Sequence, residues 1–245
     1  MKNKPKTIRP FFVIESSGNN TLKILKEESE FDFYSGFSDK QKLESIKSFH
    51  TEIHKKYPKY DILEVSTKSE VGLGRGLSAF NLMFPSRDNN KLPVEIVFQS
   101  SKVFEKGPSP NEITKKSPKE VKRIMPTLDL GNLIKFKKDG IEYPLEPKTI
   151  FYDWLYVQSL LYFNKKIKNP ILNYNIFTDI NFNPKKSINC QAFSVAIGIV
   201  FIKNNISYKD VIKFENYKKY CEKLSIYNDK PSNKLNSDKQ NYFNF

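Results

Sequence analysis

The chain has 245 residues, of which 38% are hydrophobic and 14% aromatic, so it is long enough to bury the core of one large domain or two small ones. Its 41 basic and 27 acidic residues give a net charge of +14, which attracts polyanions such as nucleic acid. Nearly all of this excess is lysine, as expected from an AT-rich genome, so charge alone is weak evidence for a partner. Two cysteines, Cys190 and Cys221, exclude a disulfide framework and a paired metal-ligand motif.

No apolar run reaches the roughly 20 residues that a membrane-spanning helix needs. The longest run, AFSVAIGIVFI, is too short and contains a serine. The basic segment MKNKPKTIRP is followed only by FFVIESSG, which stops too soon for a signal peptide. We therefore expect a soluble cytoplasmic protein with no membrane partner.

The first third of the chain predicts strands followed by a helix. FFVIES and TLKILKEE flank the turn-like segment SSGNN, which predicts a hairpin, and EFDFYSG is expected to add a further strand. The next segment, SDKQKLESIKSFHTEIHKKY, begins with Ser38 as a helix N-cap. Its apolar residues fall on one helical face: Leu43, Ile46, Phe49 and Ile53.

The middle third predicts a strand, a glycine-containing loop and a helix. DILEVST favours a strand, and residues 68–87 are expected to form a loop leading into LSAFNLMF. Residues 94–105 are expected to be helical. The segment GPSPNEITKKSPKE then predicts a polar surface loop.

The last third predicts a hairpin and two buried helices. Asp139-Gly140 suits a type I′ turn between LIKFKK and IEYPL. The apolar segments TIFYDWLYVQSLLYF and INCQAFSVAIGIVFIK predict helices. From about Ser225 the sequence is polar and aperiodic, so residues 226–245 are expected to form a mobile or surface tail.

These elements predict a single α+β domain, because the chain shows no internal repeat and no convincing linker. The domain is expected to span residues 1–225 and to be mainly helical with short β-hairpins. A β-rich N-terminal extension is expected at about residues 8–67.

Polar residues at helical spacing interrupt the apolar segment PVEIVFQSSKVFE. On a helix, Glu95, Gln99 and Lys102 lie within roughly 60° of one another, so they project from one stripe. A solvated face is the ordinary explanation of such a stripe. Because the rest of this helix is apolar or small, the alternative is a buried helix whose polar groups face partners or a cavity.

A second candidate group is Asp153 with the single tryptophan, Trp154. Asp153 shares its helical stripe with Val157 and Leu160, so it either benefits from the helix N-terminus or lines a cleft. Trp154 is either a core residue or a stacking surface for a base or sugar.

The segment FTDINFNPKKSINCQAFS carries the densest signal. Asn183 is a suitable helix N-cap with proline directly after it, and the first turn would then contain Lys185, Lys186 and Ser187. Lysines at a helix N-terminus oppose the dipole unless an anion binds there, so this turn suits a phosphate or diphosphate. Asn189 lies off the apolar stripe of the following residues, where it can reach a ligand.

Two further motifs are weak. His50 and His54 lie four residues apart, but HTEIH is not the HExxH motif and no third metal ligand is identifiable. GLGRG lacks both the P-loop pattern and the strand-to-helix context of a dinucleotide fingerprint, so a loop over a pocket is at least as good an interpretation.

The sequence resembles the NADAR (YbiA-like) family, and within it the antitoxins that partner ADP-ribosyltransferase toxins of the DarT type. Five blocks in order, covering roughly residues 10–205, carry the resemblance: FYSGFSDKQKLESI, LSAFNLM, PVEIVFQSSKVFE, YPLEPKTIFYDWLY and FTDINFNPKKSINCQA. Separate blocks in order are far harder to match by chance than one motif.

The resemblance implies an N-glycosidase that removes ADP-ribose from guanine bases of nucleic acid and needs no metal or other cofactor. Glu95 corresponds to the family's catalytic glutamate, and Asp179 to its C-terminal acid. The other family positions fall on Ser78, Phe80, Gln99, Lys102, Trp154 and Asn189. Where the wider family often has histidine after the glutamate, this chain has Ile96, so that histidine is not required or its role lies elsewhere.

In this interpretation Glu95 stabilises a cationic anomeric carbon, orients water or takes its proton. Gln99 fixes the water or a ribose hydroxyl, and Lys102 holds a phosphate or keeps Glu95 ionised. The expected partners are ADP-ribosylated nucleic acid, ADP-ribose as product and a cognate DarT-type toxin.

Two alternatives remain open from the sequence. One is a glycosidase of small phosphoribosylated metabolites of the riboflavin-pathway type. The other is a non-catalytic immunity protein that binds its toxin.

Overall fold

The structure is a computed structural model that describes residues 5–17, 21–36, 38–86, 91–107, 110–163 and 170–227. The expected tail therefore lies, from residue 228 on, outside the described residues. The strands are β1 (Lys6–Ser17), β2 (Thr21–Asp32), β3 (Ile62–Glu64), β4 (Lys102–Phe104), β5 (Leu133–Lys138), β6 (Ile141–Tyr143) and β7 (Ile176–Thr178).

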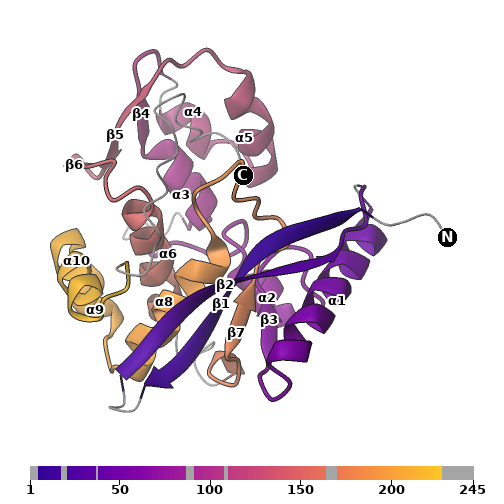
Figure 1. The fold of residues 1–245 in the computed structure, drawn as a ribbon. Helices are drawn as coiled ribbons and strands as arrows, with labels where there is room; N and C mark the ends of the chain where they lie inside the picture. Colours follow the sequence, from indigo (N-terminus) through magenta and orange to yellow (C-terminus); the bar gives the residue numbers. More distant parts are fainter. Residues whose placement is uncertain are drawn as a thin grey trace.

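The helices are short except for three that organise the core (Figure 1). The three longer ones are α1 (Asp39–Lys56), α6 (Ile150–Tyr162) and α8 (Gln191–Lys203). The others are α2 (Gly72–Leu77), α3 (Val94–Ser100), α4 (Pro110–Thr114), α5 (Pro118–Ile124), α9 (Tyr208–Val211), α10 (Phe214–Lys223) and the 3₁₀ turn Met125–Thr127. Helices and strands are intermixed along the chain, which confirms the expected α+β class.

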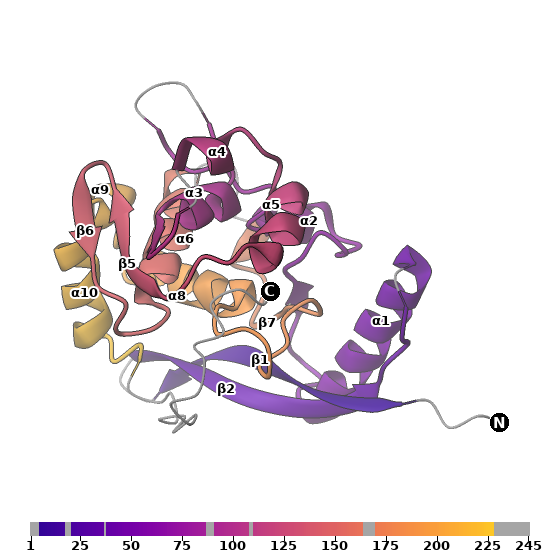
Figure 2. The same cartoon turned by 90° about the horizontal axis from the view of Figure 1, so that it is seen from above.

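A four-stranded sheet in the order β2-β1-β7-β3 forms the base of the molecule. The hairpin of β1 and β2 is antiparallel along its whole length and runs across the molecule in Figures 1 and 2. β7 is antiparallel to β1 and parallel to β3, which pairs Glu64 with Thr178. The predicted separate strand EFDFYSG is wrong, because its first residues continue β2 to Asp32.

The middle of β1 is buried on both faces, which explains why FFVIES alternates poorly. Phe11 and Val13 of β1 belong to the cluster under α1, whereas Phe12 and Ile14 belong to the main core. The Phe12 ring lies 5.1 Å from that of Phe193 in α8. Successive side chains of one strand therefore join α1 to α8 through the sheet.

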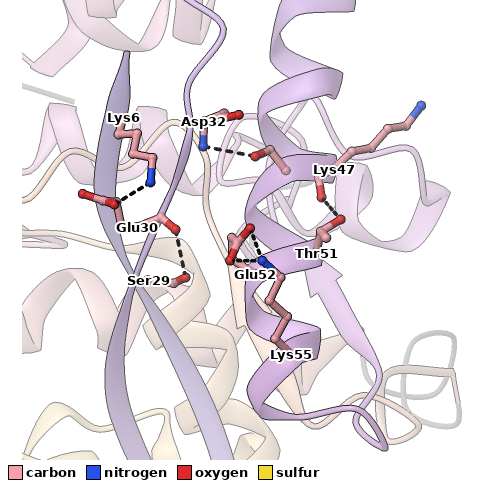
Figure 3. A network of polar contacts seen from close by, with 9 residues as sticks. Lys6, Ser29, Glu30, Asp32, Lys47, Thr51, Glu52 and Lys55 are labelled. Atoms are coloured by element: carbon pink, nitrogen blue, oxygen red, sulfur yellow. Dashed lines mark hydrogen bonds and ion pairs between the residues drawn. The ribbon is translucent and has the colours of Figure 1, made fainter. Parts of the chain in front are cut away.

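Helix α1 lies where the sequence predicts it. Ser38 and Gln41 form a reciprocal capping box, and the buried Phe49 stacks on Phe31 of β2 with ring centroids 4.5 Å apart. Figure 3 shows polar contacts around this packing, including the Asp32 N–H that donates to the Ser48 hydroxyl at 3.1 Å. The ion pairs in that view are exposed, so the aromatic burial contributes more to holding α1.

Helices α6 and α8 form the interior that the apolar sequence predicts. Nearly every residue of both helices is buried, and Gly198 of α8 lies against Leu160 of α6. Within the residues that the structure describes, no helix is long and apolar enough to cross a membrane.

The predicted helix over 94–105 is wrong beyond residue 100. Helix α3 ends at Ser100, and Lys102 lies in β4, which pairs with β5. The hydroxyls of Ser100 and Ser101 both donate to the Val97 carbonyl, at 3.1 and 2.7 Å. Such bonds compete with helix continuation, and the β-branched and aromatic residues that follow find a strand partner instead.

Two predicted loops contain helices. The 68–87 segment includes α2, and the polar segment after residue 107 includes α4 and the start of α5. The α5 start is a capping box of Ser117 and Glu120 with proline between them, a signal present in the sequence. The predicted hairpin at Asp139-Gly140 is confirmed, with φ values of 51° and 78°.

We predict that Gly74→Ala destabilises the fold by about 2 kcal/mol, whereas Gly76→Ala in the same helix does not. A methyl group on Gly74 would overlap the backbone carbonyl of Glu64 and the side chain of Ser69, whereas nothing lies near Gly76. Alanine at Gly76 is expected to gain up to about 1 kcal/mol from helix propensity. Urea unfolding of both variants measures this, and equal stabilities would contradict the close contact.

Candidate functional site

A cavity of about 210 Å³ opens between the sheet end, α3, α5 and the start of α8. Most of its lining side chains are polar, and several are almost fully buried. The lining residues are Thr67, Lys68, Ser78, Ala79, Phe80, Glu95, Lys122, Tyr152, Asp179, Asn181, Phe182, Ser187, Asn189 and Gln191. Such convergence of buried polar groups on one concave space is typical of a ligand site.

Glu95 lies in the first turn of α3 and is 2% exposed. Its N–H donates to the Ala79 carbonyl at 3.0 Å, which ties α3 to the predicted Ser78–Phe80 element. Gln99 lies one turn on and donates from Nε2 to the Glu95 Oε1 at 2.9 Å. The carboxylate is therefore held from behind while its residue lines the cavity.

Lys102 lies behind Glu95 and does not line the cavity. Burial lowers its pKa to about 7, although the charge of Glu95 opposes this, and its ammonium lies 4.7 Å from the Phe98 ring centroid. Burial raises the pKa of Glu95, while the Gln99 hydrogen bond and the charge of Lys102 lower it. Lys102 therefore acts on a ligand only through Glu95, by favouring its ionised form.

Asp179 lies directly after β7 and faces the same cavity. Its Oδ1 accepts the Asn181 N–H at 3.0 Å, and its Oδ2 accepts from Gln191 Nε2 at 3.0 Å. Gln191 also accepts the Ala79 N–H at 2.6 Å, so it joins α8 to the element beside Glu95. Burial raises the pKa of Asp179 to about 6 despite the hydrogen bonds that it accepts.

Glu64 is a buried carboxylate next to Asp179 that the sequence interpretation missed. It accepts from the Thr178 hydroxyl at 2.7 Å and from the Ile180 N–H at 2.9 Å, one residue to each side of Asp179. Burial, and then the charge of Asp179, raise its pKa to about 7. Two carboxylates held this close cannot both ionise readily, so the pair retains a proton near neutral pH.

The predicted residues Ser78, Phe80, Ser187 and Asn189 also line the cavity. The side-chain oxygen of Asn189 is buried and has no hydrogen-bond partner among the described residues. Such an oxygen is suited to accept a bond from a ligand hydroxyl or amine.

Lys122 of α5 is the cation of the cavity wall that influences both carboxylates. Its charge lowers the pKa of Glu95 and of Asp179, and its ammonium lies 5.9 Å from the centroid of the Phe80 ring. The capping box of Ser117 and Glu120 is a sequence signal for α5, but no sequence pattern indicates the direction of the Lys122 side chain.

Asp153 and Trp154 are not brought to the cavity. Asp153 accepts from the Ser194 hydroxyl at 2.7 Å and the Tyr227 hydroxyl at 3.0 Å between α6 and α8. Trp154 donates from its indole N–H to the Val211 carbonyl at 2.9 Å within an aromatic cluster. The surroundings of Trp154 agree with the core alternative that the sequence left open, and Asp153 lies in the first turn of α6, as its helix N-terminus alternative has it.

The predicted helix start at Asn183 is wrong, because α8 begins at Gln191. Asn183 instead makes a turn in which its side chain accepts the Lys185 N–H at 3.1 Å and its carbonyl accepts the Lys186 N–H at 2.9 Å. These local bonds satisfy the backbone without a helix. The two lysines are exposed and lie outside the cavity lining, between its residues Phe182 and Ser187.

His50 and His54 have different surroundings, because His54 is exposed and His50 points toward the end of the sheet. His50 Nε2 lies 2.9 Å from the Thr178 hydroxyl, and burial lowers the pKa of its imidazole to about 4. Because Thr178 donates to Glu64, the neutral His50 ring donates to Thr178. Within the described part of the chain, no group of three or more metal-ligating side chains gathers.

Comparison with known proteins gives one family match. The family model of the DarT1-associated NADAR antitoxin matches residues 7–231, which includes all the helices and cavity residues described above and all the strands except the first residue of β1. No curated protein matches the chain.

We predict that Glu64→Gln flattens the dependence of stability on pH. A carboxyl whose folded pKa is raised contributes stability below its unfolded pKa, and this is lost as pH rises through the folded value, here from about 4.5 to about 7. The difference in unfolding free energy between pH 5 and pH 8 should shrink by about 2 kcal/mol in the variant. Urea unfolding at both pH values measures it. The exposed Glu28→Gln should keep the wild-type difference, and an unchanged Glu64→Gln profile would contradict the shifted pKa.

Proposed function

Because the chain belongs to the DarT1-associated NADAR antitoxin family, we propose that it is an N-glycosidase that releases ADP-ribose from guanine bases of nucleic acid. In this way it would reverse the modification made by a cognate DarT-type toxin. The observation that carries the proposal is a pair of buried carboxylates, Glu95 and Asp179, that face one cavity from surroundings of different charge. Such a pair is suited to acid–base work on one bond.

Glu95 serves as the ionised member of the pair. Lys102 behind it and Lys122 beside it both favour the carboxylate form. A carboxylate next to the anomeric carbon stabilises the positive charge that develops as the glycosidic bond breaks. Gln99 fixes its orientation, so Gln99 and Lys102 are positioning residues.

Asp179 serves as the acid, because burial raises its pKa to about 6 and so keeps part of the protein with this group protonated near neutral pH. When the bond between the anomeric carbon and the guanine nitrogen breaks, its electron pair stays on the nitrogen, which takes a proton from Asp179. Water then adds to the anomeric carbon and gives its proton to Glu95. The products are free ADP-ribose and the unmodified base, and proton exchange with solvent restores both carboxyl groups.

The remaining lining residues suit the other parts of ADP-ribose. Lys122, whose charge acts on both carboxylates, offers positive charge to the diphosphate. Asn189 and Ser187 offer polar atoms to ribose hydroxyls, and Phe80 and Tyr152 offer ring faces.

Two other functions predict different behaviour of the same protein. A glycosidase of small phosphoribosylated metabolites would use the same carboxylates but would release no ADP-ribose from nucleic acid. An immunity protein that binds its toxin would protect cells without Glu95.

We predict that Glu95→Gln lowers the rate of ADP-ribose release on the order of 100- to 1,000-fold, because it removes the charge facing the cationic transition state. The purified protein is incubated with a guanine-ADP-ribosylated oligonucleotide, and released ADP-ribose and restored oligonucleotide are read by mass. The matched control is the exposed Glu28→Gln, which should keep the wild-type rate. Protection of toxin-expressing cells by Glu95→Gln would favour the immunity protein, and no release by the wild type would remove the proposal.

We predict that the single-turnover rate falls as pH rises through about 6 to 7, as Asp179 and Glu64 lose their shared proton. Glu64→Gln removes the group that titrates near pH 7, so the fall should become a single step near the pKa of Asp179, about 6. Rates at saturating enzyme from pH 5 to 9 measure both profiles. If the rate falls at the same pH in the wild type and in Glu64→Gln, Glu64 does not influence the protonation of Asp179 in the reaction.

A further inference from the structure

Positive side chains continue from the cavity onto the N-terminal part of α1. Lys68 lines the cavity and its ammonium pairs with Asp39, the first residue of α1. The next turn of α1 carries Lys42. The ion pair between Lys68 and Asp39 therefore joins the edge of the cavity to the start of α1.

Lys42 and Arg9 of β1 are held together by one aromatic ring. The Lys42 ammonium lies 5.2 Å, and the Arg9 guanidinium carbon 5.9 Å, from the ring centroid of Phe33. Both contacts are in the range of cation–π attraction, which fixes two flexible cations in place. Among the described residues, neither cation lies within ion-pair distance of a carboxylate. Arg9 donates instead from Nη1 to the Thr7 hydroxyl and to the Ile8 carbonyl.

The fields of these cations overlap with those at the cavity. The pKa of Lys42 is lowered by burial first, and then by the positive charges of Arg9, Lys68 and Lys122. Asp39 offsets part of the charge of Lys68. Like charges held close by packing raise the local potential, and a bound polyanion relieves their repulsion.

Arg9 and Lys42 do not line the cavity, so the ADP-ribose group is not their partner. Glu95 and Asp179 are 2% and 4% exposed, so a modified base must leave its stack to bring the glycosidic bond to them. The sugar-phosphate chain on either side of that base then remains at the cavity edge. Its phosphates are the anions that cations just outside the cavity would meet.

We propose that Arg9 and Lys42, together with Lys68 at the cavity edge, form a surface that binds the phosphates of the nucleic acid strand flanking the modified guanine. The proposal rests on the proposed function for the identity of the substrate. It assigns to Arg9 and Lys42 a role in recognising a strand rather than an isolated ADP-ribosylated nucleoside. Phe33 acts as the positioning residue for both.

The test compares two substrates, an oligonucleotide with one ADP-ribosylated guanine and the same modified guanine as a free nucleoside. For Arg9→Gln/Lys42→Gln, kcat/KM on the oligonucleotide should fall about 10-fold more than on the nucleoside at low salt. The dependence of log kcat/KM on log salt should become shallower by about 1 to 2. Lys42→Gln alone should give a smaller change of the same kind, and the nucleoside rate reports whether either variant folds.

Lys219→Gln is the matched control, because Lys219 is an exposed lysine on α10, across the molecule from α1 in Figures 1 and 2. Its ratio of the two rates should equal that of the wild type. Equal losses on both substrates in the Arg9 and Lys42 variants, or no loss on either, would overturn the surface while leaving the N-glycosidase proposal in place.

If the wild type hydrolyses neither substrate, the proposed function fails. The phosphate-binding surface is then tested by oligonucleotide binding instead of by hydrolysis. Fluorescence anisotropy then measures the affinity of the wild type and the variants for an unmodified oligonucleotide. Weaker binding by Arg9→Gln/Lys42→Gln with unchanged binding by Lys219→Gln would support the surface, and equal binding would overturn it.

Discussion

The parallel pairing of β3 with β7 sets the geometry on which the candidate site depends. It places Glu64 opposite Thr178, so that the Glu64 carboxylate bonds to the residues on both sides of Asp179. Glu64 is fully enclosed, and its bonds to Thr178 and Ile180 replace those that water would supply. The chain after β7 is thereby held in one conformation, with Asp179 at the end of the sheet facing the cavity.

The surroundings of the buried charges give the two cavity carboxylates different properties. Asp179 has a second carboxylate behind it, whereas Glu95 has an amide and an ammonium behind it. Burial raises the pKa of both groups, and Gln99 and Lys102 oppose this at Glu95, whereas Gln191 and the Asn181 N–H oppose it at Asp179. This difference, rather than the presence of two acids, makes an acid role for one and a base or electrostatic role for the other chemically coherent.

Gln191 connects the two halves of the site. Its amide donates to Asp179 and accepts from Ala79, whose carbonyl in turn accepts the Glu95 N–H. The distance between the carboxylates is thus fixed by a short series of hydrogen bonds between α8, the Ser78–Phe80 element and α3. Preorganisation of this kind lowers the reorganisation needed when charge develops in a bound ligand.

The sequence by itself determined the α+β class, the capped helix α1, the Asp139-Gly140 hairpin and the two buried helices, because capping, turn chemistry and apolar periodicity are local. The Glu95 motif and Asp179 were also found, through resemblance. Only the tertiary structure decided that Lys102 stands behind Glu95 in a strand, that Trp154 lies in an aromatic cluster, and that Glu64, Lys122 and Gln191 meet at one cavity. These outcomes depend on strand pairing and side-chain direction between distant segments, which no local pattern encodes. Glu64 and Asp179, for example, are more than 100 residues apart in the sequence.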